Sequence, residues 1–305
     1  MLRSMYSGIS GLKNFQTKLD VIGNNIANVN TIGFKKGRVV FKDLMSQTAA
    51  GASGSTARNG GTNPKQIGLG AQIATIDTIH GQGSSQFTGR VLDMAIDGDG
   101  FFIVADSIAA PPASGGAPGG LTNEKYTRNG VFYMDNHGYL VNGDGKYVFG
   151  FSEGAKNGSV GTVSAPNYGE LGTETTPKSK IGPIRIPTDA TNINIGSDGT
   201  VSYTNSEGKL NFAGQLVLAK FPNTGGLLKE GSNYYTPTSN SGKAFYGYGG
   251  SSGVGKTLSS TIEMSNVDLS EEFTEMIVAQ RGFQANTRII TTSDEILQEL
   301  VNLKR

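Results

Sequence analysis

The sequence contains no cysteine. This absence excludes disulfide bonds, thiolate catalysis and zinc sites built on cysteine. Histidine is scarce too: His80 and His137 are the only two, both near predicted turns, and we expect solvated loop residues rather than metal ligands. Charged residues are 17% of the 305 residues and the net charge is +1, so no strong field indicates nucleic acid or an acidic membrane as a partner.

Long hydrophobic runs are also missing. No stretch approaches 18 consecutive apolar residues, so the sequence predicts no membrane-spanning helix. The first residues, MLRSMYSGISGLKNF, lack the apolar core of a signal peptide, and export would therefore proceed without a cleaved leader. Glycine is abundant instead, with 45 residues. A glycine-rich chain with few charges favours turns and short strands over a compact α/β enzyme.

Both ends of the chain show helical periodicity. Near the N-terminus, apolar residues recur every seven positions and predict a helix over 4–28 that stops before Gly33; they are Met5, Leu12, Leu19 and Ile26. The C-terminal segment repeats the spacing over about 35 residues, at Leu269, Met276, Phe283, Ile290 and Leu297. There, Asp268 followed by Glu271 resembles a capping box.

The two predicted helices carry opposite charge. Residues 1–50 hold seven Lys/Arg and two Asp/Glu, whereas residues 265–305 hold four and seven. Two amphipathic helices of opposite sign are suited to lie side by side as a coiled-coil-like pair. The alternative is two surface helices packed separately on a central domain, since ordinary globular helices show similar stripes.

An asparagine cluster, GNNIANVN, ends the first helix. Asparagine is a poor residue for a helix interior because its amide competes for backbone hydrogen bonds. We expect Asn24, Asn25 and Asn28 to make polar contacts with neighbouring chains; an ordinary helix end running into a turn is the alternative.

The middle of the chain alternates apolar and polar residues in short runs separated by Asp-Gly and Asn-Gly turns, as in VLDMAID and NINIGSDGTVSY. This pattern predicts an antiparallel β domain and an α+β fold. We expect four parts: an N-terminal helical segment (1–45), a flexible connector (46–70), the β domain (71–262) and a C-terminal helix (263–305). Residues 107–124 and 150–183 are expected to be loops or a small extension of the β domain.

Residues 250–257, GSSGVGKT, match the phosphate-binding loop pattern. A working loop needs a buried parallel strand before it and a helix after it. The upstream SGKAFYGYGG is not such a strand, and the downstream LSSTIEMSNV is typical of a strand rather than a helix. A nucleotide hydrolase using Lys256 is therefore kept only as a minor alternative, and we expect no catalytic, cofactor or metal site.

Four stretches resemble the bacterial flagellar rod–hook axial proteins. They are LDVIGNNIANVNTIGFKKGRVVFKDLM (19–45), TGRVLDMAIDGDGFFIV (88–104), YTRNGVFYMDNHGYLVNGDGKYV (126–148) and the segment from EMSNVDLSEEF to the C-terminus (263–305). They lie at both ends and in the middle, in order, and cover well over a third of the chain. The chain is identified on these motifs as a member of that family.

The resemblance implies a structural, non-enzymatic subunit that forms a homopolymer. The terminal helices would line the inner tube of a hollow flagellar structure, and the β domain would form its outside. The implied partners are other axial proteins, including rod and hook–filament junction subunits, the hook cap and the type III export apparatus. The implied location is the flagellum at the cell surface. The resemblance is strongest to hook subunits, which transmit motor torque for motility; a distal-rod subunit is the alternative.

A lone chain has difficulty covering both apolar seams, so burial between copies would drive ordering and polymerisation. We expect two sets of seam residues to face each other: Leu12, Leu19, Ile22 and Ile26 against Phe273, Met276, Phe283, Ile290 and Leu297.

Overall fold

A computed structural model describes residues 2–55, 60–109, 119–151, 181–251 and 253–303. Over these residues the chain is α+β, with two long helices and a mainly antiparallel sheet, as the sequence predicts. It divides into two compact units. Unit 1 takes residues 1–29, 36–79 and 267–305, and unit 2 takes residues 30–35 and 80–266.

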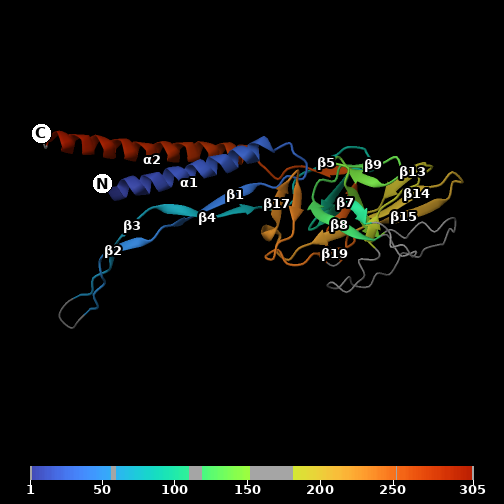
Figure 1. Ribbon diagram of the computed structural model, residues 1–305, viewed down its shortest axis with the longest axis horizontal. Helices are drawn as coiled ribbons and strands as arrows, with labels where there is room; N and C mark the ends of the chain where they lie inside the picture. The colour runs from blue at the N-terminus through green and yellow to red at the C-terminus, as the bar shows by residue number, and fades with distance from the viewer. Residues whose placement is uncertain (1, 56–59, 110–118, 152–180, 252, 304–305) are drawn as a thin grey trace. The chain divides into compact units, whose positions relative to one another are not determined.

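Unit 1 consists of two helices and two antiparallel strand pairs, coloured blue to teal and red in Figure 1. Helix α1 packs against helix α2 and also against strands β1 and β4. The elements are α1 (Leu2–Ala27), α2 (Leu269–Leu303), the pair β1 (Gly37–Asp43) and β4 (Ala71–Thr78), and the pair β2 (Ser46–Ala50) and β3 (Lys65–Gly68).

The predicted helices are confirmed closely in extent. Helix α1 ends at Ala27, one residue before the predicted end, and α2 is 35 residues long. The Asp268 carboxylate accepts hydrogen bonds from the backbone N–H groups of Ser270 (2.8 Å) and Glu271 (3.4 Å), which fixes the start of α2. The Glu271 side chain pairs with Lys36 (2.7 Å). The predicted capping box is therefore represented by the hydrogen bonds that Asp268 accepts, while the Glu271 carboxylate is engaged with Lys36.

The segment 46–70, expected as a flexible connector, contains the hairpin β2–β3. The boundary between the units falls after Ile79 rather than at residue 70, because β4 pairs with β1 along its whole length, from Gly37↔Thr78 to Asp43↔Ala71. The sequence placed residues 71–78 in the β domain, because local patterns carry no information about which strand a segment pairs with.

Unit 2 is the β domain, and every strand pairing among its described residues is antiparallel. The main sheet runs β13-β14-β15-β11-β7-β8-β18-β17, with β9, β10, β12, β16 and β19 attached, and β20–β6 and β21–β5 form separate pairs. A 3-10 turn, η2 (Thr224–Gly226), precedes β17. The strands are β5 (Ser85–Phe87), β6 (Met94–Asp97), β7 (Phe101–Ala109), β8 (Gly119–Thr127), β9 (Phe132–Met134), β10 (Leu140–Asn142), β11 (Tyr147–Phe151), β12 (Ile181–Pro183), β13 (Asn192–Ile195), β14 (Thr200–Thr204), β15 (Leu210–Leu216), β16 (Leu218–Lys220), β17 (Leu228–Gly231), β18 (Tyr234–Thr236), β19 (Phe245–Gly247), β20 (Lys256–Ser259) and β21 (Thr261–Glu263).

Strand β7 is the centre of this sheet and is buried on both faces. Phe102 and Val104 join one apolar cluster, and Phe101 and Ile103 join another on the opposite face. Successive side chains of a strand point to opposite faces, so a continuous apolar run is the expected composition for a strand covered on both sides. The expected loop at 107–124 overlaps β7 and β8, with residues 110–118 outside the described residues; most of the 150–183 extension also lies outside them.

Candidate self-assembly surface

The two terminal helices approach closely at glycine positions. A Cβ atom at Gly282 would lie 2.5 Å from the Phe15 ring, and one at Gly11 would lie 2.8 Å from the Asn286 side chain. At Gly8, a Cβ would meet Ile290 at 3.3 Å. Small residues thus let larger side chains of the other helix sit against the helix backbone.

A buried asparagine joins three segments of unit 1. The Asn25 amide donates to the Gly37 carbonyl (2.9 Å) and to the Glu272 carboxylate (3.1 Å), and its oxygen accepts from the Gly37 N–H (2.9 Å). Asn25 is 2% exposed. Its hydrogen bonds are made inside the chain, tying α1 to the start of β1 and to α2.

Opposite charges pair between the terminal segments. Lys18 of α1 contacts Glu275 of α2, and Lys36, just before β1, contacts Glu271 at 2.7 Å. These pairs are partly exposed, so each contributes little stability but favours this orientation of the helices.

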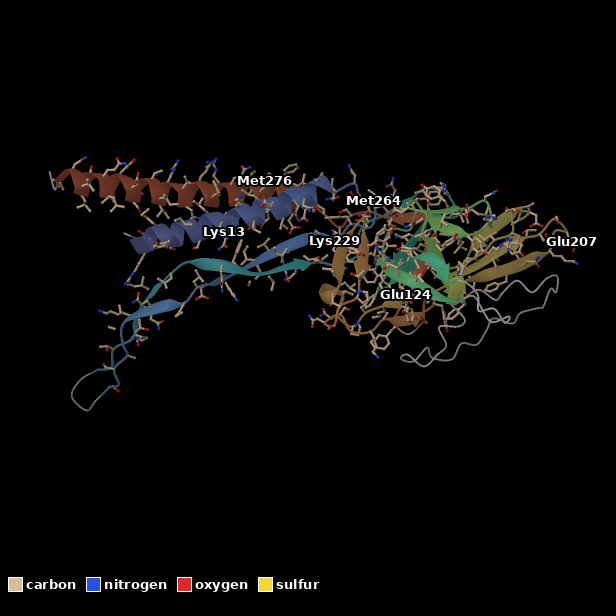
Figure 2. All side chains as sticks on the ribbon, viewed as in Figure 1. Lys13, Glu124, Glu207, Lys229, Met264 and Met276 are labelled. Atoms are coloured by element: carbon tan, nitrogen blue, oxygen red, sulfur yellow. The ribbon has the colours of Figure 1, made fainter. Side chains whose placement is uncertain are left out.

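Helix α2 has two unlike faces. The face that is buried or half-buried is mostly small or polar, consisting of Glu272, Met276, Ala279, Gly282, Asn286, Ile290, Ser293 and Leu297. Large apolar side chains on the rest of the helix are exposed: Leu269, Phe273, Ile277, Val278, Phe283, Ile289, Ile296, Leu300, Val301 and Leu303. We call these ten residues the α2 apolar surface. Figure 2 shows side chains standing away from α1 along the whole of α2.

The residues of the predicted seam differ in exposure, and those on α2 are divided between its covered face and the α2 apolar surface. On α1, Ile22 is buried and Leu12, Leu19 and Ile26 are half-buried. On α2, Met276, Ile290 and Leu297 are half-buried, whereas Phe273 and Phe283 are exposed and belong to the α2 apolar surface. The seven-residue spacing found the helices but did not separate residues covered within one chain from those left uncovered.

The three predicted asparagine contacts also differ. Asn25 is buried and used inside the chain, as described above. Asn24 is exposed, and its side-chain oxygen and backbone carbonyl accept hydrogen bonds from the Asn28 amide (2.7 and 2.9 Å). Asn24 and Asn28 stay predicted contacts with neighbouring chains.

The phosphate-loop match ends in a strand, as the sequence predicts. Lys256 and Thr257 begin β20, which pairs antiparallel with β6. The Thr257 hydroxyl donates to the Gly196 carbonyl (3.0 Å) and its N–H donates to the Ser197 carbonyl (3.0 Å). A helix N-terminus, which would direct several N–H groups at a phosphate, does not follow this loop.

Unit 2 contains a buried ion cluster that sequence reasoning missed. Glu263 lies between Lys35 (2.5 Å) and Arg128 (3.2 Å), and all three side chains are at most 4% exposed. The Glu263 carboxylate also accepts from the Gly83 N–H (3.0 Å). Burial lowers the pKa of Lys35, while the charge of Glu263 acts in the opposite direction. Three charged residues spread over 228 positions have no local pattern that reveals such a cluster.

His80 corrects another expectation. Its ring packs edge-on against Phe101 (5.7 Å) and Tyr235 (5.3 Å), so it is no solvated loop residue, whereas His137 is exposed as expected. Burial, followed by the charges of Lys35, Arg128 and Lys229, lowers the pKa of His80 to about 4. The imidazole is therefore neutral at pH 7.

Among the described residues, no group of three or more histidines, cysteines or carboxylates is placed to hold a metal ion. In the same residues no helix is long and apolar enough to cross a membrane.

Comparison with known proteins assigns the family. Three family models match: "Flagella basal body rod protein" over residues 5–35, "Flagellar hook protein FlgE/F/G D1 domain" over 95–203 and "Flagellar basal body rod FlgEFG protein C-terminal" over 258–303. The flagellar basal-body rod protein FlgG of Bacillus subtilis is 55% identical over 308 aligned positions, covering 100% of both chains. The chain belongs to the flagellar rod and hook protein family.

Members named for the rod and for the hook both match along the full chain. The flagellar hook protein FlgE of Borreliella burgdorferi is 35% identical and that of Treponema pallidum is 29% identical, each with 100% of both chains covered. Those alignments run over 441 and 480 positions, well beyond the 305 residues here, so the two hook proteins have long stretches without a counterpart in this chain.

Each member of the buried ion cluster lies in a segment matched by a different family model. Lys35 closes the rod segment, Arg128 lies in the D1 segment and Glu263 lies in the C-terminal segment. The relatives named here are structural subunits of the flagellum, and the resemblance found in the sequence is confirmed at the level of rod and hook proteins.

Proposed function

We propose that this chain is a structural subunit that polymerises into a hollow helical tube of the bacterial flagellum, with its paired terminal helices forming the inner, coiled-coil-like layer. The observation that carries the proposal is the α2 apolar surface. It places ten large apolar side chains of one helix in solvent, although α2 has a partner helix.

A second copy of this chain is the occupant that fits this surface. The exposed residues extend from Leu269 to Leu303, so they span the roughly 50 Å length of a 35-residue helix. Large exposed apolar patches mark contact sites, and ten large apolar side chains are exposed along this one helix. Burial between copies at about 25 cal/mol per Å² would drive assembly. Repetition of one heterologous contact yields an open helical array, as a tube requires.

The polymer would have further partners. By analogy with rod and hook subunits, we propose export through the type III apparatus, growth under a cap, and end-to-end joining to other axial proteins. The site of the polymer would be the flagellum at the cell surface.

Two positions along the flagellar tube are supported by specific observations. The hook, which bends while transmitting torque, is supported by the sequence motifs and by the hook proteins of Borreliella burgdorferi and Treponema pallidum, which match over the full chain. The distal rod, which is straight, is supported by the 55% identity to a basal-body rod protein and by rod alignments close to 305 positions long.

The assembly proposal is tested by Ile277→Asp, because Ile277 is 58% exposed and belongs to the α2 apolar surface. We expect the monomer to melt as the wild type does, and electron micrographs of the concentrated protein to show no tubes. Gln284→Asp, at an exposed polar position of the same helix, is the matched control and should polymerise. Normal tubes from Ile277→Asp would refute the proposal.

The shape of the wild-type polymer separates the two positions. Curved tubes that change curvature from particle to particle would assign the chain to the hook. Uniformly straight, stiff tubes would assign it to the rod. Measuring the persistence length from the same micrographs gives the answer without a further variant.

A further inference from the structure

Unit 2 has a partly open cavity of about 280 Å³ beside the buried ion cluster. Its lining includes His80, Arg128, Lys220 and Asp99. The volume is just below the roughly 300–1,000 Å³ range of sites for drug-sized ligands, so it suits a smaller molecule. Lys220 bridges Asp99 (3.2 Å) and the Gly253 carbonyl (2.7 Å) at the wall of this cavity.

Buried polar atoms without hydrogen-bond partners gather here. Among the described residues, both ring nitrogens of His80 and Nε of Arg128 are unpaired at the cavity lining, and the hydroxyl of Tyr235, whose ring packs against His80 behind the lining, is unpaired too. The Thr224 backbone lies near the imidazole but outside hydrogen-bond geometry. Since native structures leave few buried polar atoms unsatisfied, a concentration of them around one cavity points to a bound group that satisfies them.

The charges around the cavity do not balance. Lys35, Arg128 and Lys220 are positive, whereas Glu263 and Asp99 are the acidic partners that these cations contact. These five residues together carry one positive charge in excess. The charges that act on His80 are also all positive, those of Lys35, Arg128 and Lys229, and they add to burial in lowering its pKa.

We propose that this cavity binds a small anion carrying one negative charge, of the carboxylate or oxyanion class. The Nε–H of Arg128 and one N–H of His80 donate to the anion, and Lys220 supplies a positive charge at the wall. The other face of Arg128 stays engaged with Glu263 and with the carbonyl of Gly98 (2.7 Å), so the guanidinium is held in place before the anion enters.

The experiment is a titration of the unpolymerised full-length chain with formate, acetate and inorganic phosphate, each against chloride at the same ionic strength. The imidazole C–H resonances are followed by NMR. The chain has two histidines, and the exposed His137 serves as the internal reference. We expect a saturable shift of the His80 resonance with at least one of the three anions and no saturable shift of His137.

Two matched variants localise the effect. Lys220→Gln removes a wall charge and leaves Asp99 unpaired, and it should weaken anion binding by about tenfold, since a hydrogen bond to a charged group contributes on that scale. Lys209→Gln makes the same change in an exposed lysine that pairs with Glu207, and should leave binding unchanged.

Absence of a saturable His80 shift with all three anions would overturn the proposal and leave a cavity filled by water. Equal affinities in the two variants would overturn it as well. Comparing the three anions distinguishes carboxylates from phosphate, and either preference supports the proposal.

Discussion

Glu263→Gln should strongly destabilise unit 2. The substitution keeps the shape of the side chain and removes its charge. In the structure the Glu263 carboxylate faces Lys35 at 2.5 Å and Arg128 at 3.2 Å, and the Glu263 side chain is 1% exposed. Without the carboxylate, two buried cations lose their counter-charge.

The expected loss is about 3–5 kcal/mol of unfolding free energy, the cost of removing one partner from a buried ion pair. The loss should shrink as the pH rises. Burial already lowers the pKa of Lys35 and Glu263 opposes this, so in the variant the pKa falls further. The folded variant then binds fewer protons than the unfolded chain in the alkaline range below 10.5, and its stability rises with pH there.

The assay is urea unfolding, monitored separately for the two units. Apart from Tyr6, every tyrosine lies between residues 126 and 248, and tryptophan is absent, so tyrosine fluorescence reports unit 2. Circular dichroism at 222 nm reports mainly the long helices of unit 1. The control is Glu207→Gln at the tip of the β14–β15 hairpin (Figure 2), where the pair with Lys209 is exposed and its loss should change little.

A loss below about 1 kcal/mol at pH 7 would show that the cluster contributes no more than an exposed pair. The same conclusion would follow if Glu263→Gln and Glu207→Gln behaved alike. A loss that did not vary between pH 7 and 10 would contradict the expected release of the Lys35 proton.

Three further substitutions test other contacts. Asn25→Leu should destabilise unit 1 by up to about 3 kcal/mol, measured by circular dichroism in urea, because it leaves both half-buried backbone groups of Gly37 without their Asn25 partner. Gly282→Leu should push the helices apart, since even a Cβ would meet the Phe15 ring at 2.5 Å; a wild-type helical melting midpoint would contradict this. Between pH 6.5 and 4 the wild type should lose up to roughly 3 kcal/mol of stability as the pH falls, because the His80 imidazole binds a proton in the unfolded chain but resists it in the folded one, where its pKa is about 4. His80→Phe should abolish this loss, measured in carboxylate-free buffer. An unchanged acid limb in its stability profile would refute that assignment.

Local patterns in the sequence predicted the elements of the fold well. Seven-residue spacing at Leu12, Leu19 and Ile26 found α1, and alternation in NINIGSDGTVSY found the β13–β14 hairpin, whose turn places Gly199 at a φ of +83°. Both signals depend on neighbouring residues alone. Pairing partners depend on distant residues, which explains why β4 was assigned to the β domain although it pairs with β1.

The candidate surface was predicted less completely for a related reason. Periodicity marks apolar residues on a helix, but it does not say which partner covers them. Phe273 and Phe283 were expected to face α1 residues and are exposed, whereas Gly282, Asn286 and Ile290 make the close approach to α1. The contacts of Asn25 and the burial of Lys35 depend on residues far along the chain and gave no sequence signal.

The central claim is that the α2 apolar surface is open in the single chain and covered between copies. Because the chain has no cysteine, Ile277→Cys introduces one thiol within that surface, where the native side chain is 58% exposed. The rate of thiol labelling in the dilute monomer and in the assembled polymer measures its exposure directly. The account predicts rapid labelling of the monomer and labelling at least tenfold slower in the polymer, and equal rates in the two states would contradict it.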